Sequence, residues 1–179
     1  MKQEIAFPTT RRPRLTRLIG NRSGATAVEF AIVAPAFIAL LFAIMQTALV
    51  FFAQQVLQTA TTQASRLIMT GQAQAGNYTA TQFKQAICTN ATSLFTCSNI
   101  YVNVQTFSSF SSVSMLNPIS GGKFSGSGMS YSPGGSGDIE VVQVFYPWPV
   151  WPGPLGFSIA NTSGNTNVLV ATAAFRNEP

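Results

Sequence analysis

The stretch RSGATAVEFAIVAPAFIALLFAIMQTALVFFA, residues 22–53, decides the fold because it joins a basic leader to a long apolar helix. It contains one acid, Glu29, and no charged residue from position 30 to position 53. At about 1.5 Å rise per residue, a helix of this length crosses a bilayer core of about 30 Å. The stretch therefore predicts a membrane span over residues 30–53.

The charge of the chain is concentrated at its N-terminus. The net charge is +5 over 179 residues, and residues 1–24 contain six of the ten bases and one acid. A basic segment directly before a span follows the positive-inside rule. We therefore expect residues 1–24 to be a cytoplasmic leader and residues 71–179 to form an exported domain. Since the bases are confined to the leader, the distribution argues against nucleic-acid binding.

The helical pattern continues beyond the span. Apolar residues recur three and four positions apart on one face, which predicts a single helix over residues 25–70 that Gly71 ends. The polar residues between them are expected to face away from this stripe. The stripe consists of Val56, Leu57, Ala60, Ala64, Leu67 and Ile68, and the polar set of Gln54, Gln58, Thr61, Thr62 and Ser65.

The exported part shows the patterns of a small α+β domain. Thr79 to Gln82 fit a capping box, which predicts a short helix that ends near Asn90. Three strands are expected, at residues 100–105, 139–146 and 167–175, from their alternation and their β-branched or aromatic content. The Gly/Ser-rich residues 108–138 predict a long flexible connection with little core, with an extra edge strand within residues 107–115 as an option.

Three further features carry structural or binding hypotheses. Cys88 and Cys97 lie in the exported part, where a disulfide forms and persists. Pro35 lies inside the span, where it removes one helix hydrogen bond and favours a kink.

The third feature is the proline-rich run YPWPVWPGP, residues 146–154. It is too rich in proline for a central strand and predicts an extended surface loop. Trp148 and Trp151 would there contact the membrane interface or a partner. A loop whose aromatic rings fold back over the sheet is the alternative.

Glu29 supports two interpretations. Thr26 and Glu29 match a capping box, in which the glutamate accepts a backbone N–H at the helix start. Alternatively, Gly24 followed by Ala25, with Glu29 and a long apolar run after them, has the spacing of a prepilin processing site. Cleavage after Gly24 would make Ala25 the new N-terminus and Glu29 the fifth residue.

The segment GATAVEFAIVAPAFIALLFAI, residues 24–44, resembles the TadE-like family of pilus-assembly proteins, as do AxxxxSR at residues 60–66 and AAFRNEP at residues 173–179. The resemblance implies a type IV pilin-like α+β fold, in which a long N-terminal helix packs on a small antiparallel sheet with one short extra helix. It also implies cleavage after Gly24 by a prepilin peptidase, and an ion pair between Glu29 and the α-amine of Ala25 in a neighbouring subunit.

The resemblance further implies a setting and partners. Members act in the tight-adherence (Flp) pilus system of the bacterial inner membrane, with other pilin-like subunits and an assembly platform driven by a cytoplasmic ATPase. More than a hundred residues follow the helix here, whereas major Flp pilins are short. A minor, priming or tip-like pilin therefore fits better than the major subunit.

Catalysis is not expected. The chain has no histidine, which is the commonest general base and metal ligand. It shows no nucleophile elbow, phosphate-binding loop or metal-ligand cluster, so we expect no catalytic residue, cofactor or metal. Asp138 and Glu140 are expected to share one face of a strand, which alone is weak evidence of a site. An uncleaved single-span scaffold, or a binding module that uses Trp148 and Trp151, are the remaining alternatives.

Overall fold

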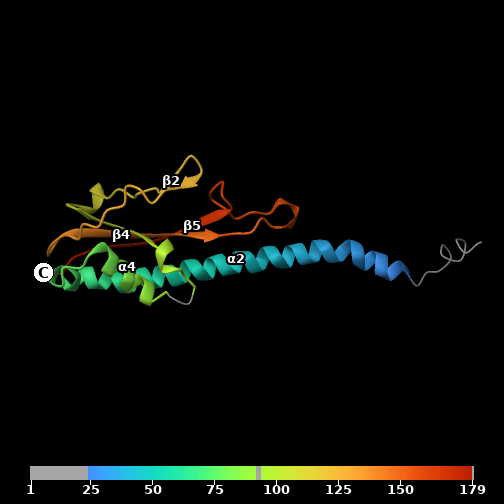
Figure 1. The fold of residues 1–179 in the computed structure, drawn as a ribbon, viewed down its shortest axis with the longest axis horizontal. Helices are drawn as coiled ribbons and strands as arrows, with labels where there is room; N and C mark the ends of the chain where they lie inside the picture. The colour runs from blue at the N-terminus through green and yellow to red at the C-terminus, as the bar shows by residue number, and fades with distance from the viewer. Residues whose placement is uncertain (1–23, 92–93, 179) are drawn as a thin grey trace, which may run out of the picture. The chain divides into compact units, whose positions relative to one another are not determined.

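The computed structural model describes residues 24–91 and 94–178 and divides the chain into two units. Unit 1 is Met1–Leu41 and unit 2 is Phe42–Pro179. Helix α2, Ala25–Met69, begins in unit 1 and ends in unit 2 (Figure 1). The predicted long helix is present and ends one residue earlier than expected. The leader lies outside the described residues, apart from Gly24.

Unit 2 contains a three-stranded antiparallel sheet in the order β1-β4-β5. Its central strand pairs Val142 with Val104 and Ala173, and Val144 with Val102 and Ala171. Branched side chains at these positions suit a pleated, buried surface. The predicted α+β pilin-like fold class is confirmed. The strands are β1 Tyr101–Phe107, β4 Ile139–Pro149 and β5 Thr166–Arg176.

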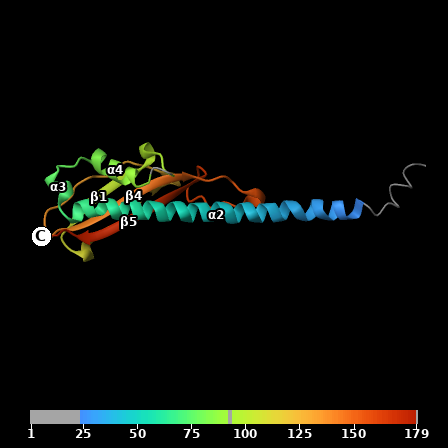
Figure 2. The ribbon, with the colours of Figure 1, turned by 90° about the horizontal axis from the view of Figure 1, so that it is seen from below.

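Within unit 2, helix α2 packs along one face of this sheet (Figure 2). Leu57, Ala60 and Ile68 of the predicted stripe are buried in the core, as expected. The prediction that Thr61 and Ser65 face away is wrong, because both are buried. A helix on a broad sheet buries a wide stripe, and small side chains suit a close approach.

Side-chain amides of α2 form hydrogen bonds with the backbone at the outer edge of β5. Gln58 Nε2 donates to the Thr172 carbonyl at 2.9 Å, and Thr172 N donates to Gln58 Oε1 at 3.2 Å. Gln54 Nε2 donates to the Val170 carbonyl at 2.7 Å. These amides satisfy backbone groups that an edge strand otherwise leaves to solvent or to another chain.

Asn161 extends this arrangement toward the start of β5. Val168 N donates to Asn161 Oδ1 at 2.8 Å, and Asn161 Nδ2 donates to the Val168 carbonyl at 3.2 Å. The prediction that Gln54 and Gln58 face away from the domain is therefore wrong. Their amides reach past the apolar stripe to the sheet edge.

Residues 108–138 cover the face of the sheet opposite α2 (Figure 1). Ser130 N donates to Asn103 Oδ1 at 3.0 Å, and Leu116 N donates to Gln143 Oε1 at 3.0 Å. Asn103 and Gln143 are buried polar residues of β1 and β4. As expected, the segment contributes little to the core, since Pro118 is its only buried residue. It is nevertheless not a free connection. Side-chain amides of the sheet hold it by its backbone.

The option of an extra strand within residues 107–115 is not realised. Phe107 ends β1, and residues 108–115 contain the short 3-10 helix η3, Phe110–Ser112, and no strand. Instead, Tyr131 forms a parallel bridge with Val104 at the edge of β1. A small hairpin, β2 Ile119–Ser120 and β3 Lys123–Phe124, lies within the same cover.

Two short helices follow α2. Gly71, at φ 74°, leads from α2 into α3, Gln72–Ala75, so it ends the long helix as predicted. Helix α4, Ala80–Thr89, has both bonds of the predicted capping box. Gln82 N donates to Thr79 Oγ1 at 3.3 Å, and Thr79 N donates to Gln82 Oε1 at 2.8 Å.

Candidate assembly site on the N-terminal helix

The predicted processing junction lies at the start of α2. Ala25 is the first residue of α2, Gly24 directly precedes it, and both are exposed. A Cβ atom added to Gly24 would meet no heavy atom within 4 Å, and its φ is not in the left-handed region. Neither packing nor backbone conformation therefore explains a glycine at this position.

Glu29 is the charged residue of this part of the helix. It is exposed and lies one turn into α2. Since the helix begins at Ala25, Thr26 lies inside it and not at its N-cap, so the capping-box interpretation is wrong. The carboxylate of Glu29 therefore has no such role at the helix start.

The surface of α2 in unit 1 is apolar and exposed. Phe30 is 73% exposed, and the other large side chains along this segment are about as open. Together they surround the helix on all sides, as in a helix that lies in lipid or among other helices. In the described part of the chain, α2 is the one helix long and apolar enough to cross a membrane. The exposed set is Val28, Phe30, Ile32, Val33, Phe37, Ile38, Leu40 and Leu41.

Pro35 lies within α2, and the helix continues through it. Because proline has no N–H, the carbonyl of Ala31 lacks its usual helical donor. Neighbouring helices or local adjustment can satisfy such a group in a membrane protein.

The proline-rich run differs from the prediction. Strand β4 continues through Pro147 and Pro149, while its pairing with β1 ends at Phe145. Val150 N donates to the Asn165 carbonyl toward β5, at 3.0 Å. Since successive N–H groups point to opposite sides of a strand, both proline nitrogens face the side that β1 leaves uncovered. The prediction of a surface loop from residue 146 is therefore wrong, because β4 runs on to Pro149, but the prolines do lie outside the part of β4 that has a neighbour on both sides.

The two tryptophans therefore differ in setting. Trp148 is half-buried on β4, where its ring packs against Phe95 and Tyr146, with centroids 5.8 and 6.1 Å apart. Trp151 follows the strand and is 68% exposed. The structure thus combines the two alternatives, with one ring folded onto the domain and the other on its surface.

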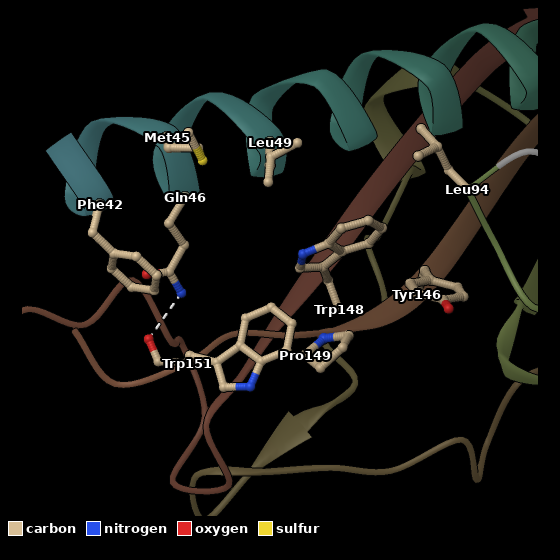
Figure 3. Close-up of a pocket in the computed structure, with 9 residues that line it drawn as sticks. All are labelled: Phe42, Met45, Gln46, Leu49, Leu94, Tyr146, Trp148, Pro149 and Trp151. Carbon is tan, nitrogen blue, oxygen red and sulfur yellow. Dashed lines mark hydrogen bonds between the residues drawn. The ribbon is translucent and has the colours of Figure 1, made fainter.

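An apolar pocket of about 340 Å³ lies in unit 2 between α2 and the end of β4 (Figure 3). Gln46 contributes a side-chain amide to the lining, and its Nε2 donates a hydrogen bond to the Trp151 carbonyl at 2.9 Å. Gln46 is 7% exposed, and its Oε1 has no hydrogen-bond partner among the described residues. The lining consists of Phe42, Met45, Gln46, Leu49, Leu94, Tyr146, Trp148, Pro149 and Trp151.

Residues 24–66 match the family model of TadE-like protein. This segment is TadE-like. The match begins at Gly24 and runs through the apolar part of α2 to Arg66. It confirms the resemblance found in the sequence and implies involvement in the assembly of tight-adherence (Tad) pili. Comparisons with curated proteins and with solved structures give no match.

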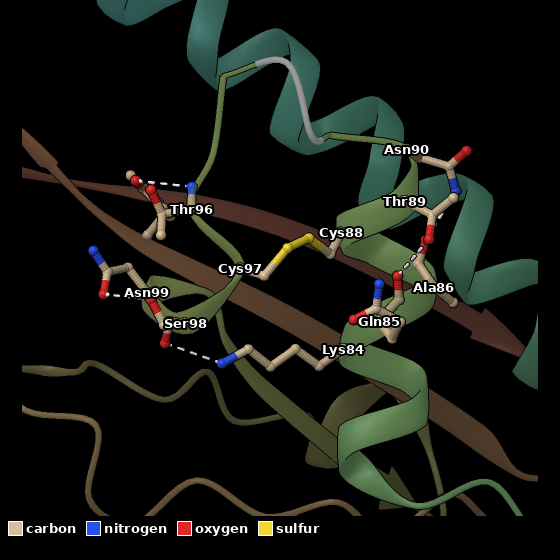
Figure 4. Close-up of a disulfide and its surroundings, with 11 residues drawn as sticks. Lys84, Gln85, Ala86, Cys88, Thr89, Asn90, Thr96, Cys97, Ser98 and Asn99 are labelled. Carbon is tan, nitrogen blue, oxygen red and sulfur yellow. Dashed lines mark hydrogen bonds between the residues drawn. A yellow bond between two sulfur atoms is a disulfide. The ribbon is translucent and has the colours of Figure 1, made fainter.

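The two cysteines lie outside the TadE-like segment and form a disulfide (Figure 4). Cys88, in α4, and Cys97, in the 3-10 helix η2, Cys97–Asn99, have Cα atoms 5.6 Å apart. This separation is in the usual range for a disulfide. Lys84 Nζ donates to the Ser98 carbonyl at 3.1 Å beside it. Both contacts tie α4 to the segment that leads into β1.

Asp138 and Glu140 do not share an exposed face. Strand β4 begins at Ile139, after Asp138, and Glu140 is 0% exposed. Glu140 Oε1 accepts hydrogen bonds from Gly134 N and from Thr106 Oγ1. Burial raises the pKa of Glu140, the charge of Asp138 raises it further, and the hydrogen bonds partly oppose both effects. Glu140 is therefore a buried acid of unit 2 and lies outside the TadE-like segment.

This raised pKa predicts how stability depends on pH. The folded chain holds the Glu140 proton at higher pH than the unfolded chain, whose glutamate pKa is about 4.3. The contribution of Glu140 is therefore complete below about pH 4 and is lost as pH rises. We expect the free energy of unfolding to fall as pH rises above about 4, and less so in Glu140→Gln. Denaturant titrations of the full chain in detergent measure both slopes, and equal slopes would contradict the prediction.

Sequence reasoning missed the glutamines of the TadE-like segment. Gln46, Gln54 and Gln58 bind the backbone of unit 2. The sequence had assigned Gln46 no role and had placed Gln54 and Gln58 away from the apolar stripe. Gln54 and Gln58 are spaced four apart, so they lie on one side of the helix. Amides at this spacing within an apolar helix were the available signal.

Proposed function

We propose that this protein is a minor pilin-like subunit of the tight-adherence (Flp) pilus, processed by a prepilin peptidase after Gly24. The observation that carries the proposal is the arrangement at the start of the TadE-like segment. A sterically unneeded glycine precedes Ala25, and Glu29 follows at the head of a helix whose large apolar side chains are exposed.

Glu29 and the apolar surface fit a role in assembly. A carboxylate taken into an apolar bundle costs several kcal/mol unless it is paired or protonated. The α-amine that cleavage creates on Ala25 supplies a positive partner when it comes from a neighbouring subunit. Such a pair forms only when two helices are in register, so it would select correctly placed subunits.

The rest of the chain favours a minor role. Unit 2 is a folded domain with its own core and its own disulfide, so it adds bulk to every copy. We propose that the protein primes the pilus or caps its tip, and that it works with other pilin-like subunits, an inner-membrane platform and a cytoplasmic ATPase. Its N-terminus would lie in the cytoplasm and unit 2 in the periplasm. We propose no enzymatic activity, since the chain has no histidine.

The mature N-terminus tests the proposal. Mass spectrometry of the protein purified from its native membrane is expected to find a chain that begins at Ala25. Gly24→Leu is expected to leave the full-length chain, because a prepilin peptidase requires a small residue there. Gly20→Leu, in the same leader, is the matched control and should be processed normally. An intact Met1 in the mature wild-type protein would refute processing and favour an uncleaved single-span scaffold.

A further inference from the structure

The stretches of α2 and of β4 that form the pocket carry no charged residue. No acid or base occurs on α2 between Glu29 and Arg66, or in the chain between Glu140 and Arg176. Both elements that form the pocket therefore meet within charge-free stretches (Figure 3). Met45 and Leu49 are exposed on the helix, and Trp151 is exposed on the loop beside them. The transfer of this charge-free surface from water to a membrane interface therefore costs little free energy.

The packing of α2 also changes the position expected for the span. The sequence predicts a span over residues 30–53, but Val50 and Ala53 are buried in the core of unit 2, and Gln46 is bonded to Trp151. A folded sheet edge with polar backbone does not enter the hydrocarbon core. The hydrocarbon core of the bilayer must therefore end near Gln46.

The length of the helix agrees with this limit. A span needs about 20 residues, and counting about 20 back from Gln46 reaches Thr26, at the start of α2. The headgroup layer adds about 5–8 Å on each side, which is about four or five helical residues. Counting forward from Gln46, this layer extends to about Phe51, an exposed aromatic residue. Phe51 and Trp151 would thus occupy the layer in which aromatic side chains are enriched.

We propose that the pocket end of unit 2, formed by Trp148, Trp151 and residues 42–49 of α2, is a membrane-interface anchor that contacts phospholipid at the headgroup level. The Gln46 amide bridges helix and loop there, through its bond to the Trp151 carbonyl. The anchor fixes the height of unit 2 above the bilayer before assembly. It rests on α2 spanning the membrane, which is part of the proposed function, and does not require cleavage.

Tryptophan fluorescence tests the anchor directly, because Trp148 and Trp151 are the only two tryptophans of the chain. The full chain is reconstituted in phosphatidylethanolamine–phosphatidylglycerol vesicles that contain lipids brominated at shallow or deep acyl positions. Trp148→Phe isolates the signal of Trp151. We expect shallow bromines to quench Trp151 roughly twofold more than deep ones, as for an interfacial aromatic residue. Trp151→Phe isolates the half-buried Trp148, which should be quenched less.

Two results would overturn the anchor. One is Trp151 emission that neither brominated lipid quenches but aqueous iodide does. The other is Trp151 emission that neither the brominated lipids nor aqueous iodide quenches, to an extent that depends on protein density in the vesicles. That result would assign the surface to a second copy of the chain. Resistance of the same sample to carbonate extraction separates the two proposals. A chain that is extracted fails as a membrane subunit, whereas a chain that stays in the membrane with unquenched Trp151 fails only as an interface anchor.

Discussion

Glu29→Leu is expected to abolish the contribution of this protein to pilus assembly, while membrane insertion and cleavage after Gly24 stay intact. Leucine makes the helix more apolar, so insertion is not impaired. The substitution also removes the carboxylate that would pair with the α-amine of Ala25 when the helix of a neighbouring subunit packs against this one. An unpaired charge in an apolar bundle costs several kcal/mol, and about 1.4 kcal/mol is already a factor of ten in an equilibrium.

Counting pili per cell measures this effect in a strain whose only copy of the protein carries the change. We expect at least about a tenfold reduction, the factor that a loss of about 1.4 kcal/mol represents. Val33→Leu is the matched control, since Val33 is also exposed on α2 and carries no charge. It should support normal piliation. Normal pilus numbers with a processed Glu29→Leu protein would show that the carboxylate has no part in assembly.

The double variant Gln54→Ala/Gln58→Ala is expected to destabilise unit 2 and to open its sheet edge. It removes three hydrogen bonds between α2 and the backbone of β5. At about 0.5–1.5 kcal/mol each, their loss lowers the free energy of unfolding by roughly 1.5–4.5 kcal/mol. The exposed edge of β5 would then offer unpaired N–H and carbonyl groups to another chain.

Chemical unfolding and light scattering of the purified chain in detergent measure the two consequences separately. Gln55→Ala/Gln63→Ala is the control, since both glutamines lie on the exposed side of α2. The control should unfold within about 0.5 kcal/mol of wild type, as surface substitutions usually do. A double variant at positions 54 and 58 that matches this control in stability and in size would mean that the amides do not hold the edge.

Much of the fold follows from local patterns. The capping box at Thr79, the stop at Gly71 and the apolar spacing of α2 each predict an element that the structure contains. These features depend on neighbours within a few residues, so the sequence carries their full information. The errors concern residues whose partners are distant in the chain.

The polar residues of the sheet and its cover illustrate those errors. Asn103 and Gln143 bind the backbone of residues 108–138, a segment whose Gly and Ser content predicts a flexible loop. Composition measures the intrinsic flexibility of a segment, but not whether buried amides elsewhere will bind its backbone. Likewise, β4 continues through Pro147 and Pro149 only because its pairing with β1 ends at Phe145, which leaves their side of the strand unpaired.

The sequence by itself determined the charge-free helix, the acid at its head and the glycine before it, because hydropathy, charge and spacing are properties of a continuous stretch. It also led to the TadE-like family. Only the tertiary structure decided which part of that helix belongs to unit 2. Gln46, Gln54 and Gln58 are bonded to backbone more than a hundred residues away. Those contacts exist only once the sheet has formed, and they set where the apolar run stops being free to enter a membrane.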